Sequence, residues 1–210
     1  MIRVLLADDH AIVRDGLRRL LGAASDIHVA GEAATGDEAL AQLATLRIDI
    51  LLLDISMPGT GFLDLLRAVR EGHPRTRVLV LSGHAEDEYA IRALRAGASG
   101  YVAKERSPQD LLAAIRKAHA GGRYVSPALA ERLAAGLTDD GPAVPHEALS
   151  DREYQVLQLL GAGLSVKEIA GRLELSAKTV STYRQRILEK LGLKTTADLI
   201  RYAVQRNLTG

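Results

Sequence analysis

The stretch that decides the fold class is Ile48-Asp49-Ile50-Leu51-Leu52-Leu53-Asp54-Ile55-Ser56-Met57-Pro58. Its apolar residues lack the apolar and polar alternation of a strand with one wet face, so the stretch predicts a strand buried on both faces of a parallel sheet. Asp54 then lies at the carboxyl end of that strand, the edge where open α/β sheets bind ligands. Taken alone, Asp54 is more simply explained as a capping or turn residue before Met57-Pro58.

A second strand end carries two more carboxylates. The apolar stretch from Ile2 to Ala7 ends at Asp8-Asp9-His10. Because the first and third strands are neighbours in the commonest small doubly wound order, we expect Asp8, Asp9 and Asp54 to converge in one crevice. Adjacent carboxylates repel one another unless a cation or a proton intervenes. Mg²⁺, which is typically held by one or two carboxylates, waters and a phosphate, suits this group.

Two later strands bring a hydroxyl and an ammonium group to the same predicted edge. The strand from Arg77 to Leu81 leads to Ser82, and the strand from Gly100 to Ala103 leads to Lys104. Both groups suit phosphoryl oxygens. Either one alone would be an ordinary loop residue, but in this order, together with three aspartates, they are hard to dismiss.

Amphipathic stretches separate the strands throughout residues 1–120, and Ile27 to Ala30 supplies the second strand. Five strands that alternate with five helices predict an α/β domain built on a doubly wound five-stranded parallel sheet.

These residues resemble the receiver domains of two-component response regulators, which have a flavodoxin-like fold. The resemblance covers residues 1–120 and rests on Asp8-Asp9, Leu53-Asp54-Ile55-Ser56-Met57-Pro58, Ser82 and Gly100-Tyr101-Val102-Ala103-Lys104. It implies that Asp54 accepts a phosphoryl group from a sensor histidine kinase. By the same resemblance, Mg²⁺ is held by Asp9, Asp54 and the backbone carbonyl of Ser56, with Asp8 in support. Lys104 then pairs with the phosphoryl group, Ser82 hydrogen-bonds to it, and Tyr101 reorients in the active state.

Composition and charge narrow the class of protein. The 210 residues are 47% hydrophobic and 25% charged, as in an ordinary globular protein, and the absence of cysteine excludes disulfides and thiolate metal sites. No apolar run approaches a membrane span, and Asp8 and Asp9 come too early for a signal peptide, so we expect a cytoplasmic protein with no membrane partner. The net charge is only +1, yet from Ser176 onward seven basic residues face two acidic ones, a local excess of five.

The second half of the chain predicts a linker and an all-α domain. Glycine, alanine and proline break the periodicity over residues 121–147, which we interpret as a linker with a short helix begun at Pro127. Residues 148–210 then carry two capping boxes, at Ser150 and Ser165, followed by a third helix that Ser176 caps and Gly192 ends. With a fourth helix, this predicts a four-helix domain containing a helix-turn-helix.

The third of these helices has two different sides. Projected at about 100° per residue, it places Val180, Tyr183, Ile187 and Leu191 on one side and Lys178, Ser181, Thr182, Gln185 and Glu189 on the other. The polar side suits base edges in a DNA major groove, and the flanking cations suit phosphates: Arg184, Arg186, Lys190 and Lys194. On this pattern alone, a solvated helix face is the simpler explanation.

Leu149 to about Val204 resembles the LuxR-type helix-turn-helix. The resemblance rests on Leu149-Ser150-Asp151-Arg152-Glu153, Gly163-Leu164-Ser165-Val166-Lys167-Glu168-Ile169-Ala170 and the third helix. A receiver joined to this domain is the NarL/FixJ type of response regulator, whose members usually bind promoter DNA as dimers on paired half-sites. Carried over by position, base edges are read by Ser181, Thr182 and Gln185, and backbone contacts come from Lys178 and Arg184. RNA polymerase is a further candidate partner.

The function expected from both resemblances is a phosphorylation switch on transcription, in which modified Asp54 controls dimerisation or exposure of the reading helix. Such a protein hydrolyses its own phosphoryl group slowly and has no external substrate. Two alternatives remain. The receiver could serve as a dimerisation or ligand-sensing module without phosphorylation, or the Asp54 crevice could belong to a phosphatase, which would need a substrate pocket and a second acid or base.

Overall fold

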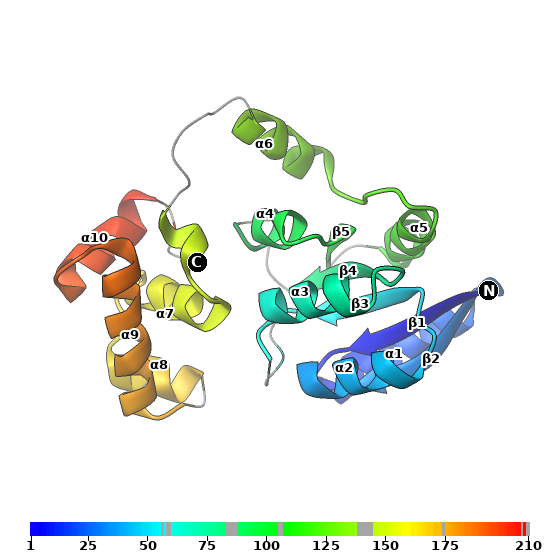
Figure 1. The fold of residues 1–210 in the computed structure, drawn as a ribbon, viewed down its shortest axis with the longest axis horizontal. Coiled ribbons are helices and arrows are strands. Elements are labelled where there is room, and N and C mark those ends of the chain that lie inside the picture. The colour runs from blue at the N-terminus through cyan, green and yellow to red at the C-terminus, as the bar shows by residue number, and fades with distance from the viewer. Residues whose placement is uncertain are drawn as a thin grey trace. The chain divides into compact units, whose positions relative to one another are not determined.

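A computed structural model gives the fold of the chain in two compact units, residues 1–140 and 141–210, which are described separately (Figure 1). The residues that it describes are 1–55, 57, 60–82, 88–104, 107–137, 145–173, 175–206 and 208. In that part of the chain no helix has both the length and the apolar character needed to span a membrane.

The first unit is built on a five-stranded parallel sheet in the order β2-β1-β3-β4-β5. Its strands are β1 Ile2–Ala7, β2 Ile27–Ala33, β3 Ile50–Asp54, β4 Arg77–Ser82 and β5 Gly100–Ala103. The helices between and after them are α1 Ala11–Gly22, α2 Gly36–Thr45, α3 Phe62–Gly72, α4 Glu88–Arg95 and α5 Pro108–His119. The doubly wound fold and the pairing of β1 with β3 are thus confirmed, and β2 is longer than predicted.

Strand β3 lies between β1 and β4, and every one of its residues is buried. Its two faces contact different helices. The residues of one face join α1 and α5 in a core cluster that includes Ile50, Leu52, Leu21 and Ile115. The uninterrupted apolar run of β3 follows from this position, because a strand covered by helices on both faces has no polar side.

The strand register brings the polar strand ends to one edge of the sheet. Ala7 is paired with Leu53 and Asp54 with Leu81, while Ser82 is paired with Ala103. The residues that follow β1 and β5 therefore emerge beside the last residues of β3 and β4, as parallel strands require.

The segment after α5 returns to the sheet. The backbone N–H of Tyr124 donates to the carbonyl of Ser99 at 2.9 Å, and the N–H of Tyr101 donates to the carbonyl of Tyr124 at 3.1 Å. Tyr124 thus forms a parallel bridge with Gly100 on the open edge of β5. This pairing satisfies edge groups of β5 that would otherwise face solvent.

Helix α6, Pro127–Leu137, begins at the predicted proline and contacts α4. The hydroxyl of Ser126 accepts a hydrogen bond from the N–H of Leu129 at 3.1 Å at the start of this helix. Residues 121–137 therefore lie against the first unit rather than apart from it. The first unit extends past the boundary at residue 120 that composition indicates, because glycine and alanine content does not report edge pairing.

The second unit consists of the 3-10 helix η1 Pro145–Ala148 and the helices α7 Asp151–Gly161, α8 Val166–Arg172, α9 Ala177–Leu191 and α10 Thr196–Gln205. Both predicted capping boxes are present, at Ser150 and Ser165, and the hydroxyl of Ser176 accepts from the N–H of Thr179 at 3.0 Å. Gly192 ends α9 with φ of 65°, a left-handed conformation that glycine adopts at little cost.

The core of the second unit begins before the predicted domain start at residue 148. His146 in η1 is buried, and its Nδ1 lies 2.8 Å from the hydroxyl of Tyr202 on α10. Its ring also lies near that of Tyr154 on α7. The 3-10 helix is therefore part of the packed domain, and a histidine flanked by proline and glutamate gave no sequence signal for this burial.

Candidate functional site

Three aspartates and a histidine meet at the edge of the sheet in the first unit. Asp8 follows β1, Asp54 ends β3, and their exposed fractions are 1% and 2%. One ligand atom from each of Asp8, Asp9, His10 and Asp54 lies within 4.8 Å of the others. The predicted convergence of the three aspartates is therefore present. Ser56, whose carbonyl is the fourth expected metal ligand, lies outside the described residues.

Lys104 joins this acidic group from the end of β5. Its Nζ donates to Oδ2 of Asp8 at 2.7 Å and lies 3.1 Å from Oδ2 of Asp54. Burial acts to lower the pKa of Lys104, but the hydrogen bond to Asp8 and the negative charge of Asp54 outweigh it and raise the pKa above its ordinary value. Lys104 is therefore a permanent cation between two buried carboxylates.

Backbone contacts hold the carboxylates in place. Oδ1 of Asp8 accepts from the N–H of His10 at 2.8 Å, and the N–H of Asp8 donates to the carbonyl of Ala33 at 3.1 Å. Nδ1 of His10 lies 2.7 Å from Oδ1 of Asp9 and 3.3 Å from Oδ1 of Asp8. No role for His10 was predicted from the sequence. Its position beside the acidic pair was the available signal, and the turn out of β1 brings the ring back onto both carboxylates.

Ser82 and Tyr101 are both fully buried, at 0% exposure. Ser82 ends β4, and its carbonyl accepts from the N–H of Lys104 at 2.7 Å, so the hydroxyl-bearing residue and the amine-bearing residue are tied at the same edge. Tyr101 lies one strand over, in register with Val80.

The donor set fits a hard divalent cation. Three carboxylates face one ammonium group, so the pocket carries an excess of negative charge, and oxygen ligands are those that Mg²⁺ prefers. The spacing of the ligand atoms lets several contact one ion. A buried carboxylate beside a cation and a divalent ion is chemically suited to attack phosphorus.

In the second unit, α9 carries the predicted nucleic-acid interface. The side chains of Lys178, Thr182, Gln185 and Arg186 are exposed, whereas Ser181 and Arg184 are half-buried. Arg184 lies four residues from both Val180 and Leu188, which are buried, so it shares their side of the helix. Arg184 is therefore less accessible than the exposed flanking cation Arg186, and its Nε is buried without a hydrogen-bond partner in the described part of the chain.

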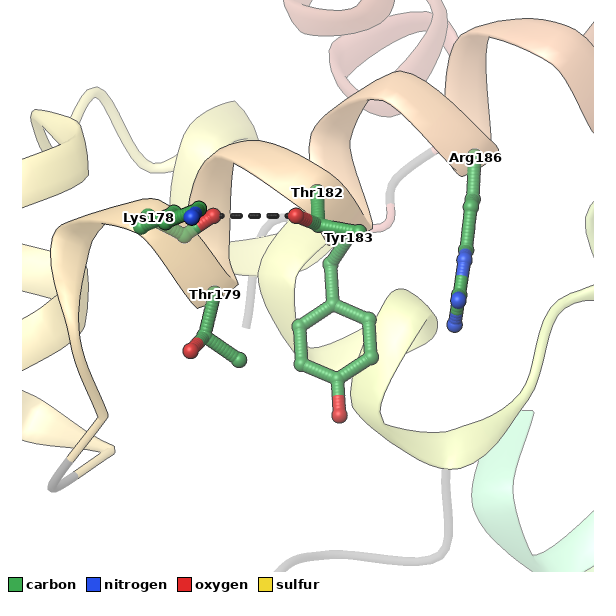
Figure 2. Close-up of a pocket in the computed structure, with 5 residues that line it drawn as sticks. All are labelled: Lys178, Thr179, Thr182, Tyr183 and Arg186. Atoms are coloured by element: carbon green, nitrogen blue, oxygen red, sulfur yellow. Dashed lines mark hydrogen bonds between the residues drawn. The ribbon is translucent and has the colours of Figure 1, made fainter.

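Tyr183 differs from its predicted place on the buried side of α9. It is half-buried and lines a hollow of about 270 Å³ with four neighbours on the same helix, Lys178, Thr179, Thr182 and Arg186 (Figure 2). Tyr183 lies one turn from Thr179 and one turn from the buried Ile187, at the border between the two sides. A projection with only two sides could not place a border residue.

Lys190, predicted to flank the DNA, has a different partner. Its Nζ lies 2.7 Å from Oε2 of Glu153 on α7 and also donates to the carbonyl of Ala148. Burial acts to raise the pKa of Glu153, but hydrogen bonds from Lys190 and from the backbone of Ser150 outweigh it and lower the pKa. Lys190 therefore fastens α9 to α7. The partner is remote in sequence, so helical spacing gave no signal for it.

Comparisons with known proteins agree with this division. Residues 4–116 match the model of the response regulator receiver domain, and residues 147–203 match that of the bacterial regulatory proteins of the luxR family. The chain is 36% identical to the response regulator UvrY of Escherichia coli K12 over 209 residues, covering 99% of this chain and 96% of UvrY. It is 39% identical over 211 residues to the response regulator GacA of Pseudomonas viridiflava, covering 99% and 98% of the two chains.

Among solved structures, the chain resembles RcsB from Salmonella enterica serovar Typhimurium bound to the promoter rprA in the presence of the phosphomimetic BeF₃⁻. The TM-score is 0.59 at 30% identity, and the match covers 96% of this chain and 97% of that one. The response regulator ChrA of a heme-sensing two-component system is also similar, with a TM-score of 0.52 at 34% identity over 99% and 98% of the two chains. On the family matches and these relatives, the chain belongs to the response regulators of the NarL/FixJ type, with a receiver domain and a LuxR-type DNA-binding domain.

Proposed function

We propose that Asp54 is the phosphoacceptor of this response regulator and that its Mg²⁺-dependent phosphorylation by a sensor histidine kinase controls DNA binding by α9. The observation that carries this proposal is the meeting of Asp8, Asp9, Asp54 and Lys104 at one sheet edge, with two carboxylates almost fully buried. The structure of the relative RcsB, bound to a promoter in the presence of a phosphomimetic, supports the same coupling.

In the proposed reaction, a carboxylate oxygen of Asp54 attacks the phosphorus of a phosphohistidine. The oxygen–phosphorus bond forms as the phosphorus–nitrogen bond breaks, and the kinase imidazole leaves. Lys104 already lies 3.1 Å from Asp54 and pairs with the phosphoryl oxygens as they arrive. Asp8, Asp9, Asp54 and the carbonyl of Ser56 would hold Mg²⁺, which neutralises charge on the phosphoryl oxygens.

The residues behind the pocket then respond to the new group. The Ser82 hydroxyl donates to a phosphoryl oxygen, and Tyr101 moves toward the place that Ser82 leaves. Phosphorylation adds charge and acceptor oxygens at Asp54, and the size of the response is set by how much better the active state binds them. The chain acts on no external substrate and hydrolyses its own aspartyl phosphate slowly.

On the DNA side, α9 enters the major groove with Ser181, Thr182 and Gln185 toward base edges and with Lys178, Arg184 and Arg186 toward phosphates. The exposed members of this set carry the proposal, since half-buried Arg184 must first turn outward. The hydroxyl of Thr182 donates to the carbonyl of Lys178 at 3.1 Å, which leaves an acceptor oxygen and a methyl group for the bases. In this proposal a second copy of the chain binds the paired half-site, and RNA polymerase is a further partner. The protein acts in the cytoplasm.

The acceptor assignment is tested by labelling the full chain with acetyl phosphate in the presence and absence of Mg²⁺. We expect wild-type protein to be labelled only with Mg²⁺ and Asp54→Ala not at all. Asp26→Ala is the control, because Asp26 is an exposed carboxylate of the same unit whose partner is Arg116. Equal labelling of Asp54→Ala and wild type would reject Asp54 as acceptor.

The alternative is a receiver that serves as a dimerisation or ligand-sensing module without phosphorylation. A DNA-binding experiment distinguishes it from the proposed switch. Bound sequences are selected from a random pool with and without acetyl phosphate, and the affinity for the selected duplex is then measured in both states. If the protein is labelled normally but binds the selected duplex with the same affinity with and without acetyl phosphate, the alternative is favoured. A difference that Asp54→Ala abolishes supports the switch.

A further inference from the structure

The hollow on α9 has a lining that suits an anion. Its described walls contain an ammonium group, a guanidinium group and three hydroxyls, and none of the described lining residues carries a carboxylate. The side chains of Thr179, Tyr183 and Arg186 leave the helix on the same side (Figure 2). At about 270 Å³ the hollow is smaller than the roughly 300–1,000 Å³ of most small-molecule sites, so it fits one group of a larger partner better than a whole ligand.

The two cationic groups and the tyrosine hydroxyl at the hollow have no partner in the described chain, whereas the hydroxyls of Thr179 and Thr182 are engaged with Ser176 and with the carbonyl of Lys178. The ammonium of Lys178, the guanidinium of Arg186 and the hydroxyl of Tyr183 make no hydrogen bond or ion pair with any described residue. Other polar side chains of α9 are engaged: Lys190 pairs with Glu153, and Gln185 donates to Glu189 at 3.2 Å. The hollow therefore concentrates the available positive charge and hydrogen-bond donors of this helix.

The two neighbouring residues Thr182 and Tyr183 face different parts of a DNA duplex. Consecutive residues lie about 100° apart around a helix, so the two side chains cannot both face the groove floor. Thr182 is exposed, near the middle of the polar side, whereas Tyr183 is half-buried at its border. The hydroxyl of Tyr183 thus lies where the groove wall, which is sugar and phosphate, would pass.

We propose that this hollow seats one backbone phosphate of bound DNA, with the Tyr183 hydroxyl and the Arg186 guanidinium donating to the same phosphate and Lys178 adding charge. This rests on the proposed binding of DNA by α9. Tyr183 is then a residue that sets the depth and rotation of the helix in the groove, and it contributes to affinity for every sequence alike, because phosphates carry no base identity.

The test uses the full chain and the duplex selected from a random pool, with dissociation constants measured over a range of salt concentrations. Tyr183→Phe removes one neutral donor and keeps the ring, so we expect binding about ten-fold weaker with the salt dependence unchanged. Arg186→Gln removes one charge, so the slope of log affinity against log salt should flatten by about 1. Gln185→Ala is the matched control on the same helix and should instead change preference between sequences.

Two further measurements separate a shared phosphate from a structural effect. If both side chains bind one phosphate, the double variant loses less affinity than the product of the single losses. A duplex series in which single phosphates are replaced by uncharged methylphosphonate should reveal one position that weakens wild type and has a smaller effect on Tyr183→Phe. Unchanged affinity in Tyr183→Phe, or an identical methylphosphonate profile, would overturn the seat while leaving DNA binding intact. A wild-type chain that selects no duplex would overturn the proposed function itself.

Discussion

Replacing Asp54, the proposed acceptor, should stabilise the first unit when no divalent ion is present. Asp54→Asn removes one negative charge from a pocket of three carboxylates, two of which, Asp8 and Asp54, pair with the ammonium of Lys104. The change is nearly isosteric, so packing around β3 is kept. The prediction therefore isolates the electrostatic cost of assembling the site.

The magnitude follows from the distances. The ligand atoms lie within 4.8 Å of one another, and at that upper limit, with an effective dielectric constant of about 20, two carboxylates repel by about 3 kcal/mol; Asp54 has two such neighbours, Asp8 and Asp9. On the same scale the attraction to Lys104 at 3.1 Å is about 5 kcal/mol. The remaining repulsion, about 1 kcal/mol, adds to the cost of burying a charge at 2% exposure. We expect Asp54→Asn to be more stable than wild type by about 1–2 kcal/mol in EDTA.

Saturating Mg²⁺ should reduce or reverse this difference, because an ion that binds only the folded state stabilises it. The stabilisation grows with the logarithm of the ion concentration over the dissociation constant and is about 2.7 kcal/mol at a hundred-fold excess. The assay is hydrogen exchange of the full chain with urea, read from peptides of β3 and α5, so that the two units are followed separately. Asp26→Asn is the control and should lose a little stability in both conditions.

Either of two results would refute the reasoning. One is a lower stability of Asp54→Asn in EDTA, which would mean that Lys104 more than compensates the acidic group. The other is an equal response of both proteins to Mg²⁺, which would mean that Asp54 is no ligand.

Three other changes test contacts that the fold depends on. In Lys190→Met, the buried Glu153 loses its cation and cannot reach water, so the second unit should lose about 2 kcal/mol of stability. Glu153→Gln keeps a capping side chain and should cost less, and urea unfolding that ranks the two variants the other way would contradict this prediction. In Gly100→Ala, the added Cβ would lie 2.5 Å from the carbonyl oxygen of Tyr124, so a loss of about 1–3 kcal/mol should appear in exchange of the β5 edge; unaltered protection there would argue against the bridge. The hydrogen bond from Arg116 lowers the pKa of Asp26 from 3.8 to about 2, so the stabilisation that this pair gives the fold is complete above pH 4 and is lost as the pH falls toward 2. Thermal unfolding of Asp26→Asn should therefore show a weaker dependence of stability on pH in that window.

Local signals were sufficient for most of the fold. The unbroken apolar run of β3 predicted a central parallel strand because only a strand covered on both faces has no polar side. Caps at Ser150, Ser165 and Ser176 marked helix starts because the hydroxyl and the N–H that it accepts from are three residues apart.

Other features depend on contacts between residues that are far apart in the chain, and local signals did not predict them. Lys190 was predicted to flank the DNA, whereas in the structure its Nζ pairs with Glu153 on another helix. Tyr124 seemed part of a linker, yet its backbone completes the edge of β5. Arg184, predicted at the flank of α9, and Tyr183, predicted on its apolar side, are both half-buried, because their exposure depends on how α7 and α8 pack against that helix.

The sequence by itself thus determined the parallel sheet with its first and third strands as neighbours, the helix starts and the convergence of the three aspartates, since parallel strands place their carboxyl ends at one edge whatever the details of packing. The tertiary structure alone decided which cations of α9 remain available, that His10 borders the carboxylates, and that the segment after α5 belongs to the first unit. These outcomes depend on contacts between residues remote in sequence, and neither periodicity nor spacing records which side chain meets which.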